Sequence, residues 1–305
     1  MTRRLIAALA IEIVILGALV TVAADQIAHT HVEKLGGVNV WGYRGPVLHQ
    51  KKGNEVRIVV TGGDLAFGWG VAASEALAPS VRDPVRLRVD RPGHPERIVT
   101  GVTTGARGLP PTLYAAWIDR YAYLRPDVIC LVLDPIGHVL ADGTFLPDRR
   151  SLAFRRFGYS PILPLVLEEK GVMTHSALRR LAGGVLDGVD RVMAEPVDAP
   201  GTVVSGRDYA ASIDGAVRAA LRASTAGVVL VLPPAKDNAA MKDRLSATIG
   251  LERVRLVDLG ADPRMLDPAL RLDGFSFSVA GHAVAAQNIA PWVLDLLEKA
   301  GLQGA

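Results

Sequence analysis

The chain has very little cysteine, few aromatic residues and almost no excess of either charge, and each shortage excludes a class of protein. The single cysteine, Cys130, cannot form a disulfide within the chain, and its place in the apolar run "DVICLVL" predicts a small core residue. Aromatic residues make up 5% of the chain and the formal net charge is +3. This excludes the stacking platform and basic groove of a nucleic-acid-binding protein. Half of the 305 residues are apolar, which is enough for a sizeable buried core.

The N-terminus predicts a membrane anchor over residues 1–24. The run Leu5–Ala24, "LIAALAIEIVILGALVTVAA", contains one ionisable residue, Glu12, and its length as a helix matches a bilayer core of about 30 Å. Arg3 and Arg4 before the run and Asp25 after it favour a cytoplasmic N-terminus and an exported body. A cleaved signal peptide is the alternative, because "VAA" before Asp25 suits a signal peptidase. Glu12 is either an acid tolerated in lipid or a contact with a partner's membrane helix.

After the anchor, strand-like and helix-like segments alternate, which predicts a doubly wound, three-layer α/β domain with a parallel sheet. We expect residues 25–52 to form a connector and residues 53–305 to form this one domain. Strands are expected at Val56–Thr61, at Val85–Val89 or Arg97–Val102, and at Val128–Leu133, Gly227–Leu232 and Arg253–Asp258. Helices are expected at Ala72–Val81, Pro111–Leu124, Ser176–Ala194, Asp208–Ser224, Lys236–Ile249 and Val279–Ala300. The site should lie at the carboxyl ends of the strands, with Gly137–Lys170 as an excursion over its rim.

Five segments of the chain resemble blocks of the SGNH (GDSL-type) hydrolases, in that family's order. One resembles the strand and Gly-Asp-Ser loop of the first block, one the approach to the third block, and one the closing Asp-x-x-His block with its last helix. The other two resemble the lead-in and the mid-section of the membrane-anchored bacterial members. The five are "NVWGYRGP" (39–46), "RIVVTGGDLAFGWGV" (57–71), "YLRPDVICLVL" (123–133), "HSALRRL" (175–181) and "LDGFSFSVAGHAVAAQNIAPWVLDLL" (272–297).

This resemblance implies a flavodoxin-like SGNH-hydrolase fold and acyl transfer from an ester to water or to a sugar hydroxyl. In that chemistry a serine attacks the carbonyl and a histidine takes its proton. An aspartate orients the histidine, and donors on a glycine and an asparagine hold the oxyanion. We expect no cofactor and no metal. The resemblance also implies a single-pass protein of a bacterial inner membrane, with its body on the periplasmic side.

The residues at the family's catalytic positions are mostly different in this chain. An ungapped alignment places Asp64 at the serine and Gly63 at the acid before it, whereas a one-residue gap places Leu65 at the serine. In the closing block Asp273 matches the aspartate, but Ser276 stands in place of the histidine. Because a triad works as a unit, these differences predict loss of its chemistry.

The same alignment predicts further residues of the site. Ile136 stands where the family has its oxyanion asparagine, and the second-block glycine is either Gly101 or Gly105. Trp69 either lines the cleft, where it would stack on a sugar, or belongs to the core. Asp64 either caps the first helix by accepting backbone N–H bonds or attacks as a carboxylate.

We therefore expect a membrane-anchored SGNH-hydrolase-like protein that is catalytically inactive and binds, or helps to process, acylated envelope or exported polysaccharide. Its partners would be a carbohydrate or acyl-ester ligand and a membrane-bound acyltransferase or envelope assembly. The alternative is an active esterase or O-acetyltransferase with a rearranged site drawn from Asp64, Asp273, Ser276, His138 or His282. A third possibility is a structural envelope protein whose cleft is filled by side chains. An open pocket at Asp64 would favour binding, and a closed one would favour scaffolding.

Overall fold

The computed structural model describes residues 2–35, 38–39, 41–89, 97–106, 109–134, 163, 206–272 and 275–302. The chain divides into two compact units, residues 1–42 with 147–196 and residues 43–146 with 197–305. The expected helix Ser176–Ala194 and the excursion Gly137–Lys170, apart from Leu163, lie outside the described residues. So do three predicted site residues, Ile136, His138 and Asp273.

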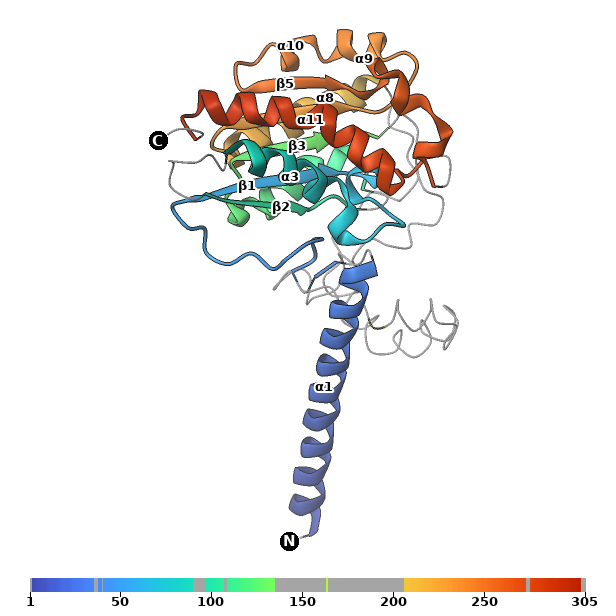
Figure 1. The fold of residues 1–305 in the computed structure, drawn as a ribbon. Coiled ribbons are helices and arrows are strands. Elements are labelled where there is room, and N and C mark those ends of the chain that lie inside the picture. The colour runs from blue at the N-terminus through green and yellow to red at the C-terminus, as the bar shows by residue number, and fades with distance from the viewer. Residues whose placement is uncertain are drawn as a thin grey trace. The chain divides into compact units, whose positions relative to one another are not determined.

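The second unit is built on a parallel sheet of five strands in the order β2-β1-β3-β4-β5 (Figure 1). This is the order of flavodoxin-like sheets, whose chain changes direction between β1 and β3 and whose ligands bind at that switch point. The α/β prediction is therefore confirmed. The strands are β1 Glu55–Gly62, β2 Ile98–Thr103, β3 Val128–Val132, β4 Gly227–Leu232 and β5 Val254–Asp258.

Helices cover both faces of this sheet because its central strands are apolar on both sides. In β1, Ile58 and Val60 belong to the core packed under α3 and α11, which lie in front of the sheet in Figure 1. Val59 and Thr61 face the other side, towards α4 and the end of α8, as the alternation along a strand requires. The described helices are α1 Thr2–Leu35, α2 Asp64–Phe67, α3 Leu77–Val89, α4 Tyr114–Arg120, α8 Gly206–Ala223, α9 Ala239–Arg244, α10 Ser246–Ile249 and α11 Val279–Lys299.

Some helix bounds differ from those expected. The helix predicted at Ala72–Val81 is a 3₁₀ turn, Ala73–Glu75, followed by α3, which runs on to Val89. The strand alternative at Val85–Val89 was therefore wrong, and the strand expected at Arg97–Val102 is β2. The helix expected at Lys236–Ile249 is divided at Leu245 into α9 and α10. The other 3₁₀ turns in the described chain are Pro111–Leu113, Ala122–Leu124, Leu259–Ala261, Pro263–Leu266 and Pro268–Leu270.

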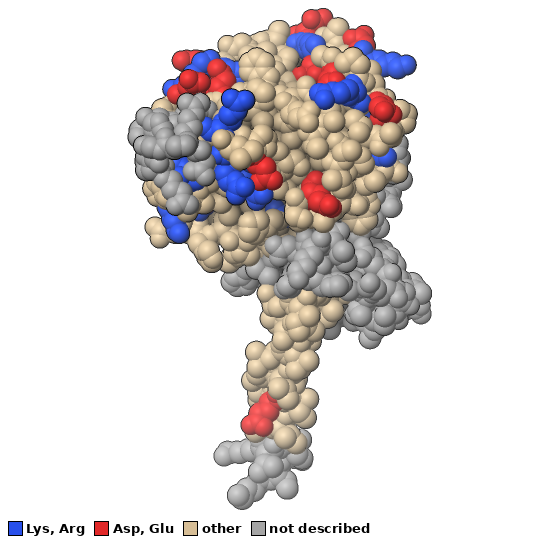
Figure 2. All heavy atoms as spheres, viewed as in Figure 1, with Lys and Arg blue, Asp and Glu red and all other residues tan. Residues whose placement is uncertain are grey.

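In the first unit, α1 continues beyond the predicted anchor and ends at Leu35. Residues 25–35 contain neither glycine nor proline, and a Gly-Gly pair follows Leu35, so no helix breaker occurs before residue 36. By length and composition α1 could cross a membrane through Ile11–Ala28, although a signal sequence passes the same test. Its described surface is almost entirely uncharged, in contrast to the mixed charges on the body (Figure 2). Within α1, just after the predicted anchor, Asp25 accepts a hydrogen bond of 2.7 Å from the backbone N–H of Leu163.

Candidate functional site

The loop after β1 passes so close to the end of β3 that it requires glycine at two positions. Gly62 has φ +136°, and a Cβ there would lie 2.1 Å from the carbonyl oxygen of Val132. A Cβ on Gly63 would lie 1.8 Å from a carboxylate oxygen of Asp134, the second residue after β3. The glycines thus allow the start of α2 to meet the carboxyl end of β3. This is the switch point of the sheet, at the carboxyl ends of the strands, where the sequence analysis expects a site.

Asp134 caps the start of α2. Its Oδ2 accepts the backbone N–H of Asp64 at 2.9 Å, and its Oδ1 accepts that of Leu65 at 3.1 Å. Only 3% of Asp64 and 6% of Asp134 is exposed, so these bonds form away from bulk water. The sequence suggested Asp64 as a cap of this helix, but the residue that accepts these two amide N–H groups is Asp134. The helix has Gly63 at its N-cap, which supplies no side chain for the purpose.

The two aspartates form a buried acidic pair. Burial, and then the charge of Asp64, raises the pKa of Asp134 to about 7, against the lowering effect of the two amide bonds. Two tyrosines stand beside the pair. The hydroxyl of Tyr209 donates to the backbone carbonyl of Asp134 at 2.9 Å, and a Cβ on Gly63 would lie 3.0 Å from the hydroxyl of Tyr114. Burial and the charge of Asp134 raise the pKa of both tyrosines. Near neutral pH, Asp134 can therefore either hold or release a proton.

The other predicted site residues lie in different surroundings. Trp69 is half-buried, just beyond α2. Gly105 packs against α2, because a Cβ there would lie 2.7 Å from the Cβ of Ala66. Ser276, which the resemblance aligns with a histidine, is buried, and its carbonyl accepts the N–H of Leu272 at 2.9 Å. The structure thus brings Asp64, Gly63 and Gly105 together around α2.

His282, which the sequence offered as part of a rearranged site, lies in the core. It is fully buried at the start of α11, and neither ring nitrogen has a hydrogen-bond partner among the described residues. Its ring lies edge-on to that of Phe277, with centroids 5.4 Å apart. Burial, and then the charge of Arg44, lowers its pKa to about 3. His282 is thus a buried, neutral imidazole that forms no hydrogen bond to Asp64, and its surroundings are those of a core residue.

Arg44, which sequence reasoning did not assign to the site, clamps the loop that follows α2. Its guanidinium donates to the carbonyl oxygens of Phe67, of Gly68 at 2.6 Å and of Val71 at 2.7 Å. It also lies over the Phe67 ring, 4.8 Å from the centroid. Its backbone pairs with Thr103 at the end of β2 through bonds of 2.8 and 2.9 Å. The end of the predicted connector therefore belongs to the sheet unit and holds the site loop in place.

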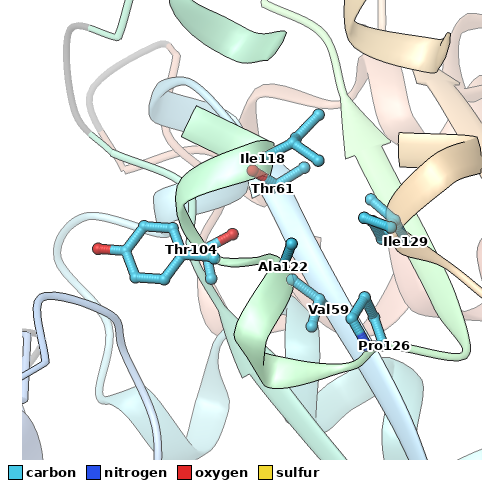
Figure 3. A pocket seen from close by; sticks show the side chains of 9 residues that line it. Val59, Thr61, Thr104, Ile118, Ala122, Pro126 and Ile129 are labelled. Carbon is cyan, nitrogen blue, oxygen red and sulfur yellow. The ribbon is translucent and has the colours of Figure 1, made fainter. Parts of the chain in front are cut away.

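A small cavity lies beside β1 and β3, under α4. Figure 3 shows the side chains of Val59, Thr61, Ile118 and Ile129 around it. It has room for about one water molecule, which excludes a sugar or an ester as its occupant. Neither Asp64 nor Asp134 is among its lining residues, so this cavity is distinct from the acidic pair.

The fold and the site define a parallel α/β protein with a buried acidic pair at the switch point of its sheet. Comparisons of the chain with models of protein families, with curated proteins and with solved structures found no match.

Proposed function

We propose that this chain is a membrane-anchored SGNH-hydrolase-like protein that no longer performs acyl transfer and that binds, or helps to process, acylated envelope or exported polysaccharide. The observation that carries the proposal is the capping of α2 by Asp134. In acyl-transfer enzymes, backbone N–H groups beside the nucleophile point at the oxygen on which negative charge develops. Here the two amides at that position already bind a carboxylate. An oxyanion would have to displace that carboxylate and withstand the charge of both acids.

The side chains at the site support the same proposal. Asp64 stands at the nucleophile position of the resemblance but is buried, and an acyl anhydride on it would still need a base to activate water. Ser276 supplies no imidazole, and His282 is buried away from any hydrogen-bond partner among the described residues. Each of these departures removes a separate part of the catalytic unit.

Turnover is tested on the full chain in detergent, with an aryl acetate as substrate and a fluorophosphonate as serine-reactive probe. We expect neither hydrolysis nor labelling above the level of heat-denatured protein. Hydrolysis that disappears in Asp64→Asn would overturn the proposal.

Carbohydrate binding would fall to Trp69, the half-exposed aromatic residue beside the site loop, because an aromatic ring offers a large, rigid apolar face to a sugar. Co-sedimentation of the full chain with an O-acetylated polysaccharide and with its de-acetylated form measures this. We expect the acetylated form to bind more strongly and Trp69→Ala to weaken that binding at least fivefold. Trp292→Ala is the matched control, since Trp292 is 42% exposed on α11. Equal losses in both variants would refute a site at Trp69.

We further propose that the body lies on the periplasmic side of a bacterial inner membrane, with a membrane-bound acyltransferase as a candidate partner. The charges around Leu5–Ala24 support this orientation. Because Cys130 is the only cysteine and is buried, an introduced thiol can be labelled against a low background. Leu87→Cys, at a position 72% exposed on α3, should react with a membrane-impermeant maleimide once the outer membrane is opened. Reaction only after cell lysis would place the body in the cytoplasm.

A second candidate is an active enzyme that uses the acidic pair for proton transfer. The pKa of about 7 for Asp134 favours it, because a general acid or base works best near the ambient pH. Such an enzyme would show a pH–rate profile with a limb near pH 7 that Asp134→Asn abolishes. A rate that does not depend on pH in that range would exclude it.

A further inference from the structure

The depth of Glu12 follows from the anchor as the sequence predicts it, which begins six residues before the apolar stretch Ile11–Ala28 of α1. Arg4 and Asp25 bracket the twenty residues Leu5–Ala24, which as a helix match a bilayer core of about 30 Å. Glu12 is the eighth residue of this run, so at 1.5 Å per residue it lies about 11 Å inside the core. At that depth neither aqueous phase can solvate the carboxylate directly, and acids so placed usually face a partner or a functional path.

The surface around Glu12 is open and otherwise apolar. Four apolar residues lie three, four or seven positions from Glu12, which places them on its side of the helix. They are Leu9, Ile15, Leu16 and Leu19. These four side chains are 53% to 63% exposed. No described residue forms a hydrogen bond or an ion pair with the side chain of Glu12. In the part of the chain that the structure describes, nothing covers this face, which we call the Glu12 face.

We propose that the Glu12 face docks against a membrane helix of a partner protein that carries a basic side chain at the same depth. Charge complementarity selects this occupant, because a Lys or Arg would satisfy the acid where water cannot. A second copy of this chain would place Glu12 against Glu12, and like charges repel. Ala8, one turn before Glu12, leaves space for the partner backbone to approach closely. The inference rests on the membrane placement in the proposed function, but not on the loss of catalysis.

The test uses the full chain in lipid vesicles, labelled with a fluorescence donor at its N-terminus, and synthetic Leu-rich membrane helices labelled with an acceptor. One helix carries a single Lys at the depth of Glu12, a second carries Leu there, and a third carries Lys near the opposite surface. Energy transfer gives the association constants. We expect the depth-matched Lys helix to associate at least tenfold more tightly than the other two.

Variants separate a contact at Glu12 from general helix packing. Glu12→Leu should reduce association of the Lys helix to that of the Leu helix, whereas Leu19→Ile, the matched control on the same face, should leave it unchanged. Equal association of the Lys and Leu helices with the natural chain would overturn the proposal. So would stronger, Glu12-dependent association between copies of the chain. If the chain does not float with the vesicles, the membrane placement itself is wrong, whereas the turnover and polysaccharide assays test the rest of the proposed function separately.

Discussion

Folding shifts the pKa values of two buried groups in the sheet unit in opposite directions. The shifts can be measured through the pH dependence of the unfolding free energy. The pKa of Asp134 rises from 3.8 to about 7 in the folded chain, so folding takes up a proton between these values. The unfolding free energy therefore falls as pH rises from about 4 to about 7. The pKa of His282 falls from 6.5 to about 3, so folding releases a proton there. Its contribution to stability is present above pH 6.5 and is lost as pH falls towards 3.

Where the two ranges overlap, from about pH 4 to 6.5, the contributions cancel in the natural chain. Each changes the unfolding free energy by about 1.4 kcal/mol per pH unit when fully expressed. His282→Leu removes one of them at little other cost, because the imidazole makes no hydrogen bond among the described residues and leucine keeps its approximate volume. As pH rises from 4 to 6.5, the unfolding free energy of the variant should therefore fall by about 3 kcal/mol relative to that of the natural chain. Asp134→Asn should show the opposite slope.

Urea unfolding of the full chain in detergent, followed by near-ultraviolet circular dichroism, gives these free energies. Groups other than the two contribute equally to all variants and disappear from the differences. His49→Leu, which removes an exposed imidazole, controls for loss of a histidine as such. Parallel pH profiles for the natural chain and His282→Leu would refute the assignment of His282 as a neutral core residue.

Three further outcomes follow from the site. Gly63→Ala should cost more than 2 kcal/mol of stability, because its Cβ would lie 1.8 Å from a capping carboxylate oxygen; Gly53→Ala, where a Cβ meets nothing within 4 Å, is the control in the same urea titration. Arg44→Lys should make the loop Phe67–Val71 susceptible to limited proteolysis, since an ammonium cannot reproduce the planar fork that holds three carbonyls; unchanged cleavage would show that the clamp is dispensable. Asp64→Asn should stabilise the chain above pH 7, because the charge of Asp64 raises the pKa of Asp134 and each pKa unit corresponds to about 1.4 kcal/mol; calorimetry at pH 8 and pH 5 should show the effect only at pH 8.

Most of the sheet could be predicted from the sequence because its strands are short apolar runs with breakers at each end. β4, for example, spans Gly227–Leu232 as expected. The error at Val85–Val89 has a physical cause. The sequence "VRLRV" alternates as a half-buried strand does, but packing of Val81, Val85 and Val89 in the core with α11 makes the segment part of a helix. Tertiary contacts of this kind override local pattern.

The sequence also predicted where the site would lie, but not which groups would meet there. Asp134 follows the buried strand β3 at the switch point, but it was not among the residues that the sequence singled out. Its function as a cap depends on the register of β1 and β3, which places Gly62 beside Val132 and which no local signal in the sequence specifies. Arg44 was harder to find, since it lies 23 residues from the first carbonyl that it binds. A long-range contact of one side chain leaves no periodicity in the sequence.

The acidic pair offers a test of whether Asp64 takes part in the binding that we propose. Two carboxyls beside each other in the core reduce stability when both are charged, and carboxyls with a pKa perturbed in this way cluster at functional sites. The capping of α2 accounts for Asp134, because its two oxygens satisfy two buried amides, but it does not account for the acid at position 64. If Asp64→Asn stabilises the chain and leaves polysaccharide binding intact, Asp64 has no part in the binding that we propose. If the same variant stabilises the chain and abolishes binding, Asp64 belongs to the proposed recognition site, and its cost in stability is the cost of that recognition.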